Sequence, residues 1–166
     1  TDAEIVELSM RLGGAGVQFV LTEAEIMALA TAMSSVGIEA EAGGSAMTQV
    51  MKKMQNAVSD GGATLEKFAE ASGMSAKEFA AVFNKEPIKA LDAFIKGLSK
   101  SSEEGANLND ILAEVGIKGI RESDAVLRLA GASELLAEAV DTSTNAWEEN
   151  TALSDEVEER YKTTES

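Results

Sequence analysis

The sequence predicts an all-α protein, with several short helices in a compact bundle of hairpins and orthogonal packings, one long C-terminal helix and no β-sheet. Three observations support this fold class. The 166 residues include one proline, and 45% are hydrophobic, in a composition dominated by Ala, Leu, Met and Glu, which favour helices. Apolar residues recur at helical spacing along most of the chain. Glycines separate these stretches at positions that suit helix ends.

The N-terminal part of the chain is predicted to contain two helices. Residues 1–21 are expected to form a connecting helix. Thr22 and Glu25 then have the spacing of a capping box, which predicts the start of a second helix. Gly37 is placed to end that helix in a left-handed conformation.

A third helix is expected over about 44–58, after the hinge at Gly37, and Gly43 and Gly44 are expected to give it room to leave and pack back. Its apolar stripe consists of three methionines and two valines: Met47, Val50, Met51, Met54 and Val58. This spacing is typical of a core face, although methionine-rich faces also bind partners. The core interpretation is the favoured one.

Three further helices are expected between residues 63 and 98. Gly73 ends the first, and Ser75 with Glu78 forms a second capping box. Pro87 suits the first turn of the last of the three, because no N–H is needed there. The residues expected to face inward are Leu65, Phe68, Ala69, Phe79, Ala80, Phe83, Ile88, Leu91, Phe94, Ile95 and Leu98.

The segment 99–107 is the most linker-like part of the chain. Asn107 is expected to cap a short helix that Gly116 closes, and another helix should end near Gly131. From 132 to about 161 no strong helix breaker occurs, which predicts one long helix.

The predicted C-terminal helix carries a heptad seam in which three members are polar. The seam consists of Leu136, Val140, Ser143, Trp147, Asn150, Ser154, Val157 and Tyr161. Four of these, Trp147, Val140, Val157 and Tyr161, are candidate partner contacts. The favoured interpretation is a surface helix whose first turns pack on their own domain, and a coiled-coil extension is the alternative.

The composition excludes several classes of function. The net charge is −15, and neither histidine nor cysteine is present. The negative charge makes direct contact with a phosphate backbone unfavourable. The lack of histidine removes the commonest general base, and the lack of cysteine removes thiol nucleophiles. Both absences remove the usual zinc ligands. No apolar run approaches the length of a membrane span. We expect no catalytic residues, no cofactor, no metal site, no sequence-specific nucleic-acid binding and no membrane insertion by this segment.

We expect three regions: the connecting helix at 1–21, a compact helical core domain at 22–131, and a long acidic C-terminal helix at 132–166. Residues 101–166 carry most of the negative charge, −11 against −4 for the first 100 residues. The chain opens on Thr1 and stops after a helical run, which favours a segment that leads into a longer protein.

Four blocks of the chain closely resemble the conserved core region of phage tail tape-measure proteins. They read ALATAMSSVGIEAEAGGSAMTQVMKKMQNAV, FAEASGMSAKEFAAVFNKEPIKALDAFIKGL, LNDILAEVGIKGIRESDAVLRLAGA and NTALSDEVEERYKTTES. The resemblance extends over almost the whole chain from Glu23 onward. Its most specific parts are Gly-Ile-Glu-Ala at 37–40, Gly-Ile-Arg at 119–121 before Leu-Arg-Leu-Ala-Gly, and the closing Tyr-Lys-Thr-Thr-Glu-Ser.

The resemblance implies a structural role in the interior of the tail tube. Tape-measure proteins set tail length during assembly, are kept soluble by tail-assembly chaperones in the bacterial cytoplasm, and leave the tail as DNA is delivered. The resemblance thus implies tail-tube and chaperone proteins as partners, with self-association in the tail lumen, and a prophage would be a natural source. It carries over no catalytic residues.

The residues themselves add two points. Repeated helix ends and a dense apolar pattern are unexpected in a simple ruler, which favours a compact node within an otherwise extended protein. Without the resemblance, the alternative is a helical scaffold or regulatory binding module that uses the methionine face or Trp147. An enzyme would need catalysis without His or Cys.

Overall fold

The computed structural model describes residues 2–15, 21–145, 153 and 157. Within these residues all regular elements are helices and no strand occurs, which confirms the all-α prediction. The elements are α1 (Asp2–Ala15), α2 (Glu23–Ser35), α3 (Ala40–Asp60), α4 (Ala63–Ala71), α5 (Ala76–Lys85), α6 (Pro87–Glu103), α7 (Leu108–Glu114) and α8 (Ile120–Gly131). Residues 133–145 are also helical.

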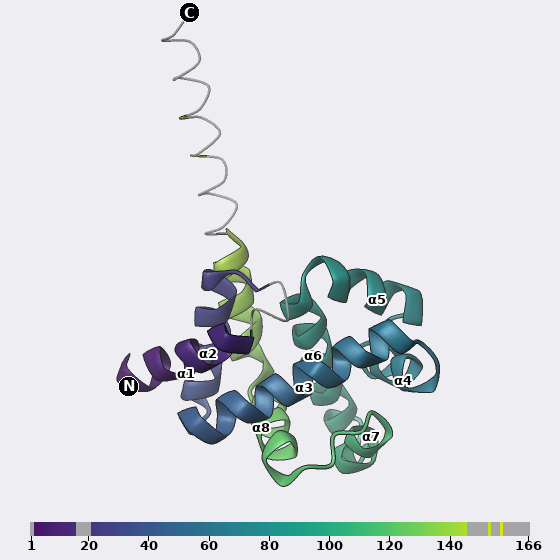
Figure 1. The fold of residues 1–166 in the computed structure, drawn as a ribbon. Coiled ribbons are helices and arrows are strands. Elements are labelled where there is room, and N and C mark those ends of the chain that lie inside the picture. The colour runs from purple at the N-terminus through teal and green to yellow at the C-terminus, as the bar shows by residue number, and fades with distance from the viewer. Residues whose placement is uncertain (1, 16–20, 146–152, 154–156, 158–166) are drawn as a thin grey trace, which may run out of the picture.

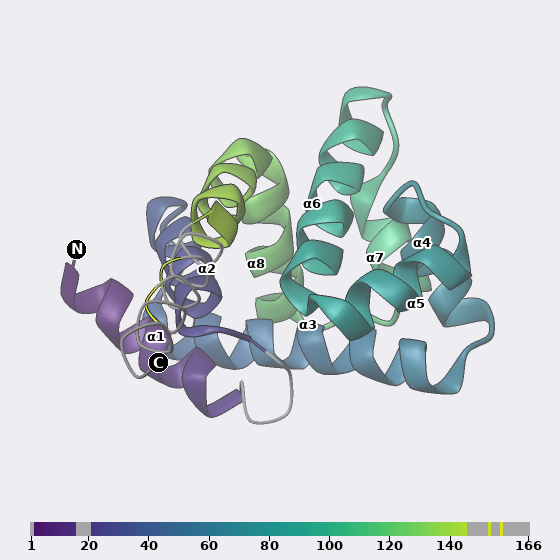
Figure 2. The same ribbon diagram turned by 90° about the horizontal axis from the view of Figure 1, so that it is seen from above.

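Helix α3 is the element on which the others are arranged. It contacts α1 near one end and α4 and α5 near the other, and it also contacts α8. Figure 2 shows α3 lying across the body, with α1 towards one end, α4 and α5 towards the other, and α8 between them. One cluster of buried side chains runs from Leu8 and Leu12 in α1 to Leu136 and Val140 in the 133–145 helix. The three predicted regions stay a prediction, because this shared core neither defines nor excludes their boundaries.

The helix starts follow the local sequence signals. Thr22 Oγ1 accepts a hydrogen bond from the Glu25 backbone N–H at 3.1 Å, and Ser75 Oγ accepts one from Glu78 at 3.1 Å. Asn107 caps α7 in the same manner through the Asn109 N–H. Each side-chain oxygen thus satisfies an N–H that has no partner inside its helix. The predicted N-caps at Thr22 and Ser75 and the N1 position of Pro87 are confirmed.

Gly37, Gly73 and Gly116 end three helices by one mechanism. All three have positive φ, of 76°, 72° and 81°. After α2, the Gly37 N–H bonds to the Ser34 carbonyl at 3.1 Å and the Ile38 N–H to the Met33 carbonyl at 3.0 Å. This is a Schellman motif, and the same pair of bonds follows α4 and α7. The predicted glycine stops are confirmed.

Two boundaries differ from the prediction. Helix α3 begins at Ala40, four residues before the predicted start, so Gly43 and Gly44 lie buried inside it. A Cβ on Gly43 would clash with the Ile38 side chain, and one on Gly44 would lie 2.9 Å from Arg11 Cβ. The glycines therefore allow α1 and the α2–α3 turn to approach the α3 backbone. In addition, α6 runs to Glu103, so the predicted linker at 99–107 is mostly helix.

The interior is filled by aromatic and methionine side chains. Phe68 of α4 stacks on Phe79 of α5, with ring centroids 5.9 Å apart, and meets Phe94 of α6 edge-on at 5.2 Å. Of the inward-facing residues predicted between 63 and 98, only Ala80 is half-buried instead of buried. The stripe of Met47, Met51 and Met54 is also fully buried. The methionines therefore pack the core, and that face offers no surface to a partner.

The predicted long C-terminal helix is described only over its first part. In the 133–145 helix, the first three seam residues, Leu136, Val140 and Ser143, are buried against the body. This agrees with the interpretation in which the first turns pack on their own domain. Figure 1 shows this helix standing beside α2. The remaining length of the predicted helix falls mostly outside the described residues.

Candidate partner-binding groove

An open groove of about 500 Å³ lies between α2 and the 133–145 helix. The two helices are adjacent in both ribbon views (Figures 1 and 2), although about 100 residues separate them in the sequence. Residues that line the groove on α2 include Ala24, Met27, Ala28, Thr31 and Ser35. Those on the opposite wall are Leu135, Glu138, Ala139, Thr142 and Ser143.

The groove exists because α2 places its large and small side chains on different faces. Leu29 and Met33 point into the core and are fully buried. The outer face carries small residues at helical spacing, from Ala24 to Ser35, which leave space beside the helix axis. Met27 stands at the edge of the groove with 46% of its surface exposed, and its sulfur lies 3.7 Å from Ser9 Oγ of α1.

Three hydroxyl groups in the groove lining are turned back onto their own helices. Thr31 Oγ1 donates to the Met27 carbonyl at 2.7 Å, and Ser35 Oγ donates to the Thr31 carbonyl at 2.9 Å. On the opposite wall, Ser143 Oγ donates to the Val140 carbonyl at 2.8 Å. The groove therefore presents mainly methyl and methylene groups, and the exposed lining is largely apolar.

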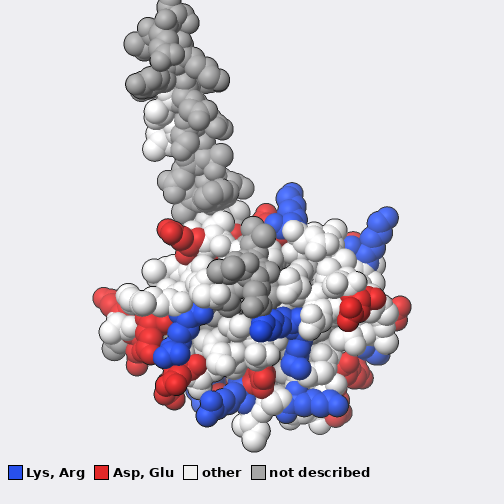
Figure 3. Space-filling view, viewed as in Figure 1, with Lys and Arg blue, Asp and Glu red and all other residues white. Residues whose placement is uncertain are grey.

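The charges on the two helices that form the groove have one sign, and among the described residues that line it Glu138 is the charged one. Helix α2 contributes Glu23 and Glu25, the 133–145 helix contributes Glu134, Glu138 and Asp141, and neither helix contains lysine or arginine. Elsewhere the surface is mixed, and Figure 3 shows basic side chains interspersed with acidic ones over the body. The groove is thus an apolar depression between two acidic helices.

Two carboxyls have raised pKa values where these helices meet α6. Burial raises the pKa of Glu25, and the neighbouring Glu86 adds to the increase, while hydrogen bonds at Thr22 and the charge of Lys89 oppose it.

Burial also raises the pKa of Asp92, which is 7% exposed. The hydrogen bond and charge of Lys96, whose Nζ lies 2.9 Å from Asp92 Oδ2, oppose this shift. Asp141 of the 133–145 helix raises the pKa of Asp92 further.

The residues predicted as partner contacts have different surroundings. Val140 is 2% exposed and lies in the core, whereas Val157 is 53% exposed. Trp147 and Tyr161 lie outside the described residues, and their predicted role is untested. The sequence reasoning missed the groove itself. The signal for it was the stripe of small residues on one face of α2.

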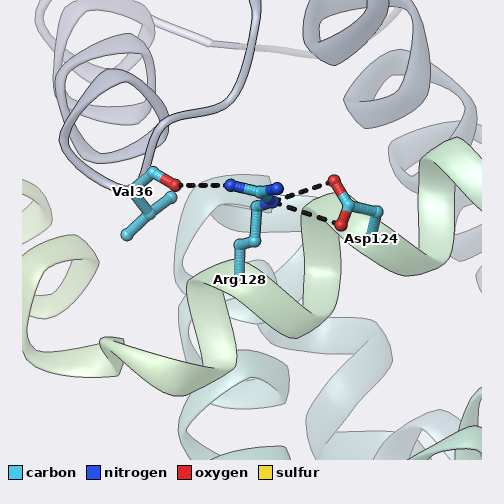
Figure 4. A network of polar contacts seen from close by, with 3 residues as sticks. All are labelled: Val36, Asp124 and Arg128. Carbon is cyan, nitrogen blue, oxygen red and sulfur yellow. Dashed lines mark hydrogen bonds and ion pairs between the residues drawn. The ribbon is translucent and has the colours of Figure 1, made fainter.

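Of the three stop glycines, Gly37 lies beside another helix. Arg128 of α8 reaches the end of α2, where its Nη1 donates to the Val36 carbonyl at 3.2 Å (Figure 4). The Arg128 Nε also contacts Asp124 Oδ2 at 3.0 Å. The turn after α2 is thus fixed from outside as well as by its own backbone. The glycines are structural residues and do not converge on one site.

Within the described part of the chain, no group of three or more acidic side chains is arranged to hold a metal ion. Among the same residues, no helix has both the length and the apolar character required to cross a bilayer. No protein-family model matches the chain, and no similar curated protein or solved structure was found.

Proposed function

We propose that this chain is a structural segment of a phage tail tape-measure protein and that it acts by packing and by contact with partner proteins. The proposal rests on the sequence resemblance of four blocks between Ala28 and Ser166. On this reading its partners are tail-tube and tail-assembly chaperone proteins, with self-association in the tail lumen. Its locations are the interior of the virion tail and, during assembly, the bacterial cytoplasm.

The observation that carries the structural part of the proposal is the series of Schellman turns at Gly37, Gly73 and Gly116. All three lie within the resembling blocks. The turn at Gly73 folds the chain back between α4 and α5, and Phe68, Phe79 and Phe94 of α4, α5 and α6 form one aromatic cluster. A segment folded in this way contributes a packed node to a tape-measure chain in addition to its length.

The experiment distinguishes the effect of the number of residues from the effect of folding, in phage particles that carry the gene. Phe68→Ala keeps the number of residues but removes the centre of the aromatic cluster, and Val6→Ala at the exposed surface is its control. We expect Phe68→Ala to reduce the yield of infectious particles while the tails that do form keep their length in electron micrographs. An in-frame deletion of 64–98 should abolish infectivity.

Two results would contradict the proposal at different levels. If mass spectrometry does not find the chain in purified tails, the phage assignment is wrong. If deletion of 64–98 gives infectious particles with tails shorter by about 50 Å, as expected for lost helix alone, the segment is a simple ruler and the node is wrong.

The second candidate function is a helical scaffold or regulatory binding module without catalytic activity. The apolar groove between α2 and the 133–145 helix favours it, since such a groove suits the apolar face of a partner helix. A gene adjacent to regulators, with no tail genes nearby, would support this candidate over the first.

A further inference from the structure

The shape of the groove points to an elongated occupant. Its α2 wall extends from Ala24 to Ser35, which is about 16 Å along a helix axis. Small side chains at each turn allow the backbone of a third helix to come close to both walls. The dimensions therefore suit about three turns of an added helix.

The chemistry of the lining favours an apolar face on that occupant. The hydroxyls of Thr31, Ser35 and Ser143 are already bonded to carbonyls of their own helices. A small polar ligand would need convergent polar groups to fix its orientation. The lining instead offers dispersion contacts and apolar surface to bury, from Leu135, Met27 and the alanines.

The acidic charge of the two helices determines which charge is favourable on either side of the occupant's apolar face. Glu138 lines the groove, and Glu23, Glu134 and Asp141 lie on the same two helices, which contain no lysine or arginine. A second copy of this chain docked through the same face would bring like charges together, which is unfavourable. Lysine and arginine flanks would be complementary.

We propose that the groove between α2 and the 133–145 helix is a docking site for an amphipathic helix of a different protein, with an apolar stripe flanked by lysine and arginine. The apolar stripe fills the groove, and the basic flanks lie against the acidic walls. This inference is independent of the proposed role in a phage tail, because it uses only the shape, lining and charge of the groove.

The test uses two fluorescent peptides of about 18 residues, long enough to form a helix. Both carry the same leucine stripe; one has lysines at the flanking positions and its twin has glutamates. Binding to the full 166-residue chain is measured by anisotropy at low and high salt. We expect the lysine peptide to bind about tenfold more tightly than its twin, and salt to weaken it.

Two sets of variants show where the peptide binds. The double variant Glu134→Lys, Glu138→Lys reverses the acidic wall, and Glu103→Lys, Glu104→Lys at the end of α6 makes the same change in net charge elsewhere. We expect the first to weaken binding of the lysine peptide by about tenfold and the second by less than about twofold, since exposed charges act mainly at short range.

Filling the groove tests its shape separately from its charge. Ala139→Trp and Thr31→Trp place an indole in the groove from opposite walls, and Thr31 is exposed, so its variant should keep the native fold. We expect both to abolish binding of the lysine peptide. Thermal unfolding followed by circular dichroism verifies that each variant is folded.

Several outcomes would overturn the inference. The two peptides could bind equally well, or the two charge variants could lose the same affinity for the lysine peptide. A folded Thr31→Trp protein could also bind the lysine peptide unchanged. Light scattering provides a further test. A dimer of the wild-type chain that Thr31→Trp converts to monomer would assign the groove to a second copy instead.

Discussion

The guanidinium of Arg128 in α8 donates a hydrogen bond to the backbone carbonyl of Val36 at the end of α2, across 92 residues of sequence. This carbonyl is among the last of its helix and has no intrahelical partner. The contact connects two helices that are far apart in the chain and holds the turn at Gly37 against α8.

Replacing Arg128 by alanine should therefore destabilise the fold by about 1 kcal/mol, the usual net value of one such hydrogen bond. Urea unfolding measures the change. Arg121→Ala, at the exposed start of α8, is the matched control. Hydrogen exchange of the Ile38 amide, which closes the turn, should accelerate in Arg128→Ala only. Unchanged exchange at Ile38 would show that the turn does not need Arg128.

The buried glycine of α3 and an open glycine of α1 should respond in opposite directions to alanine. Gly13→Ala should stabilise by about 0.5–1 kcal/mol, because alanine favours a helix and its Cβ meets nothing within 4 Å. Gly44→Ala gains the same propensity but places a Cβ 2.9 Å from Arg11 Cβ.

The crowding at Gly44 should cost about 1–3 kcal/mol, so the net effect is destabilising. The melting temperatures of the two variants, measured against wild type, check both signs. A Gly44→Ala protein that melts as high as Gly13→Ala would mean that α1 can move away from α3 without loss.

The aromatic cluster should dominate the stability of the α4–α6 region. Phe68 contacts both Phe79 and Phe94 and is fully buried. Phe68→Ala should cost about 3–5 kcal/mol through the lost burial and the cavity that it leaves. Denaturant unfolding measures this cost, with the exposed Val6→Ala as control. A loss below about 1 kcal/mol would show that the neighbouring rings collapse into the space.

Stability near Asp92 should increase as the pH falls. Its pKa is raised above the ordinary 3.8 by burial, with Lys96 opposing and Asp141 adding to the shift. The folded state thus binds the proton more readily than the unfolded state, so the ionised carboxyl costs stability at neutral pH. This cost is relieved as the pH falls through the raised pKa towards 3.8.

The variant Asp92→Asn removes the charge and should gain most, relative to wild type, at pH 7. Its advantage should shrink as the pH approaches the ordinary value of an aspartate. Urea unfolding at several pH values measures the difference, and Asp60→Asn at the exposed end of α3 reports the effect of removing a surface carboxylate. An advantage of Asp92→Asn that grows towards acid pH would reverse the sign argued here.

The sequence was most informative where structure depends on neighbouring residues. The N-caps at Thr22 and Ser75 and the left-handed stops at Gly37, Gly73 and Gly116 are local, since each involves bonds within about five residues. Apolar spacing likewise predicted the buried faces of most helices.

The errors and omissions depend on contacts between distant segments. The third helix was predicted to start at about residue 44, but Gly43 and Gly44 lie inside α3, where the close approach of Arg11 and Ile38 requires small residues. The groove was missed because it forms only when the 133–145 helix lies beside α2. No local pattern encodes that pairing, and the small residues of α2 have a meaning only once the neighbour is in place.

Because of the three glycine stops, the contour length of the chain no longer determines its end-to-end distance. Residues 23–131 as one continuous helix would reach about 160 Å. With left-handed turns at Gly37, Gly73 and Gly116, the same residues return repeatedly to α3. Insertions inside a loop would then leave the end-to-end distance almost unchanged. The distance that this stretch spans thus depends on the size of the folded body and not on the number of residues in it.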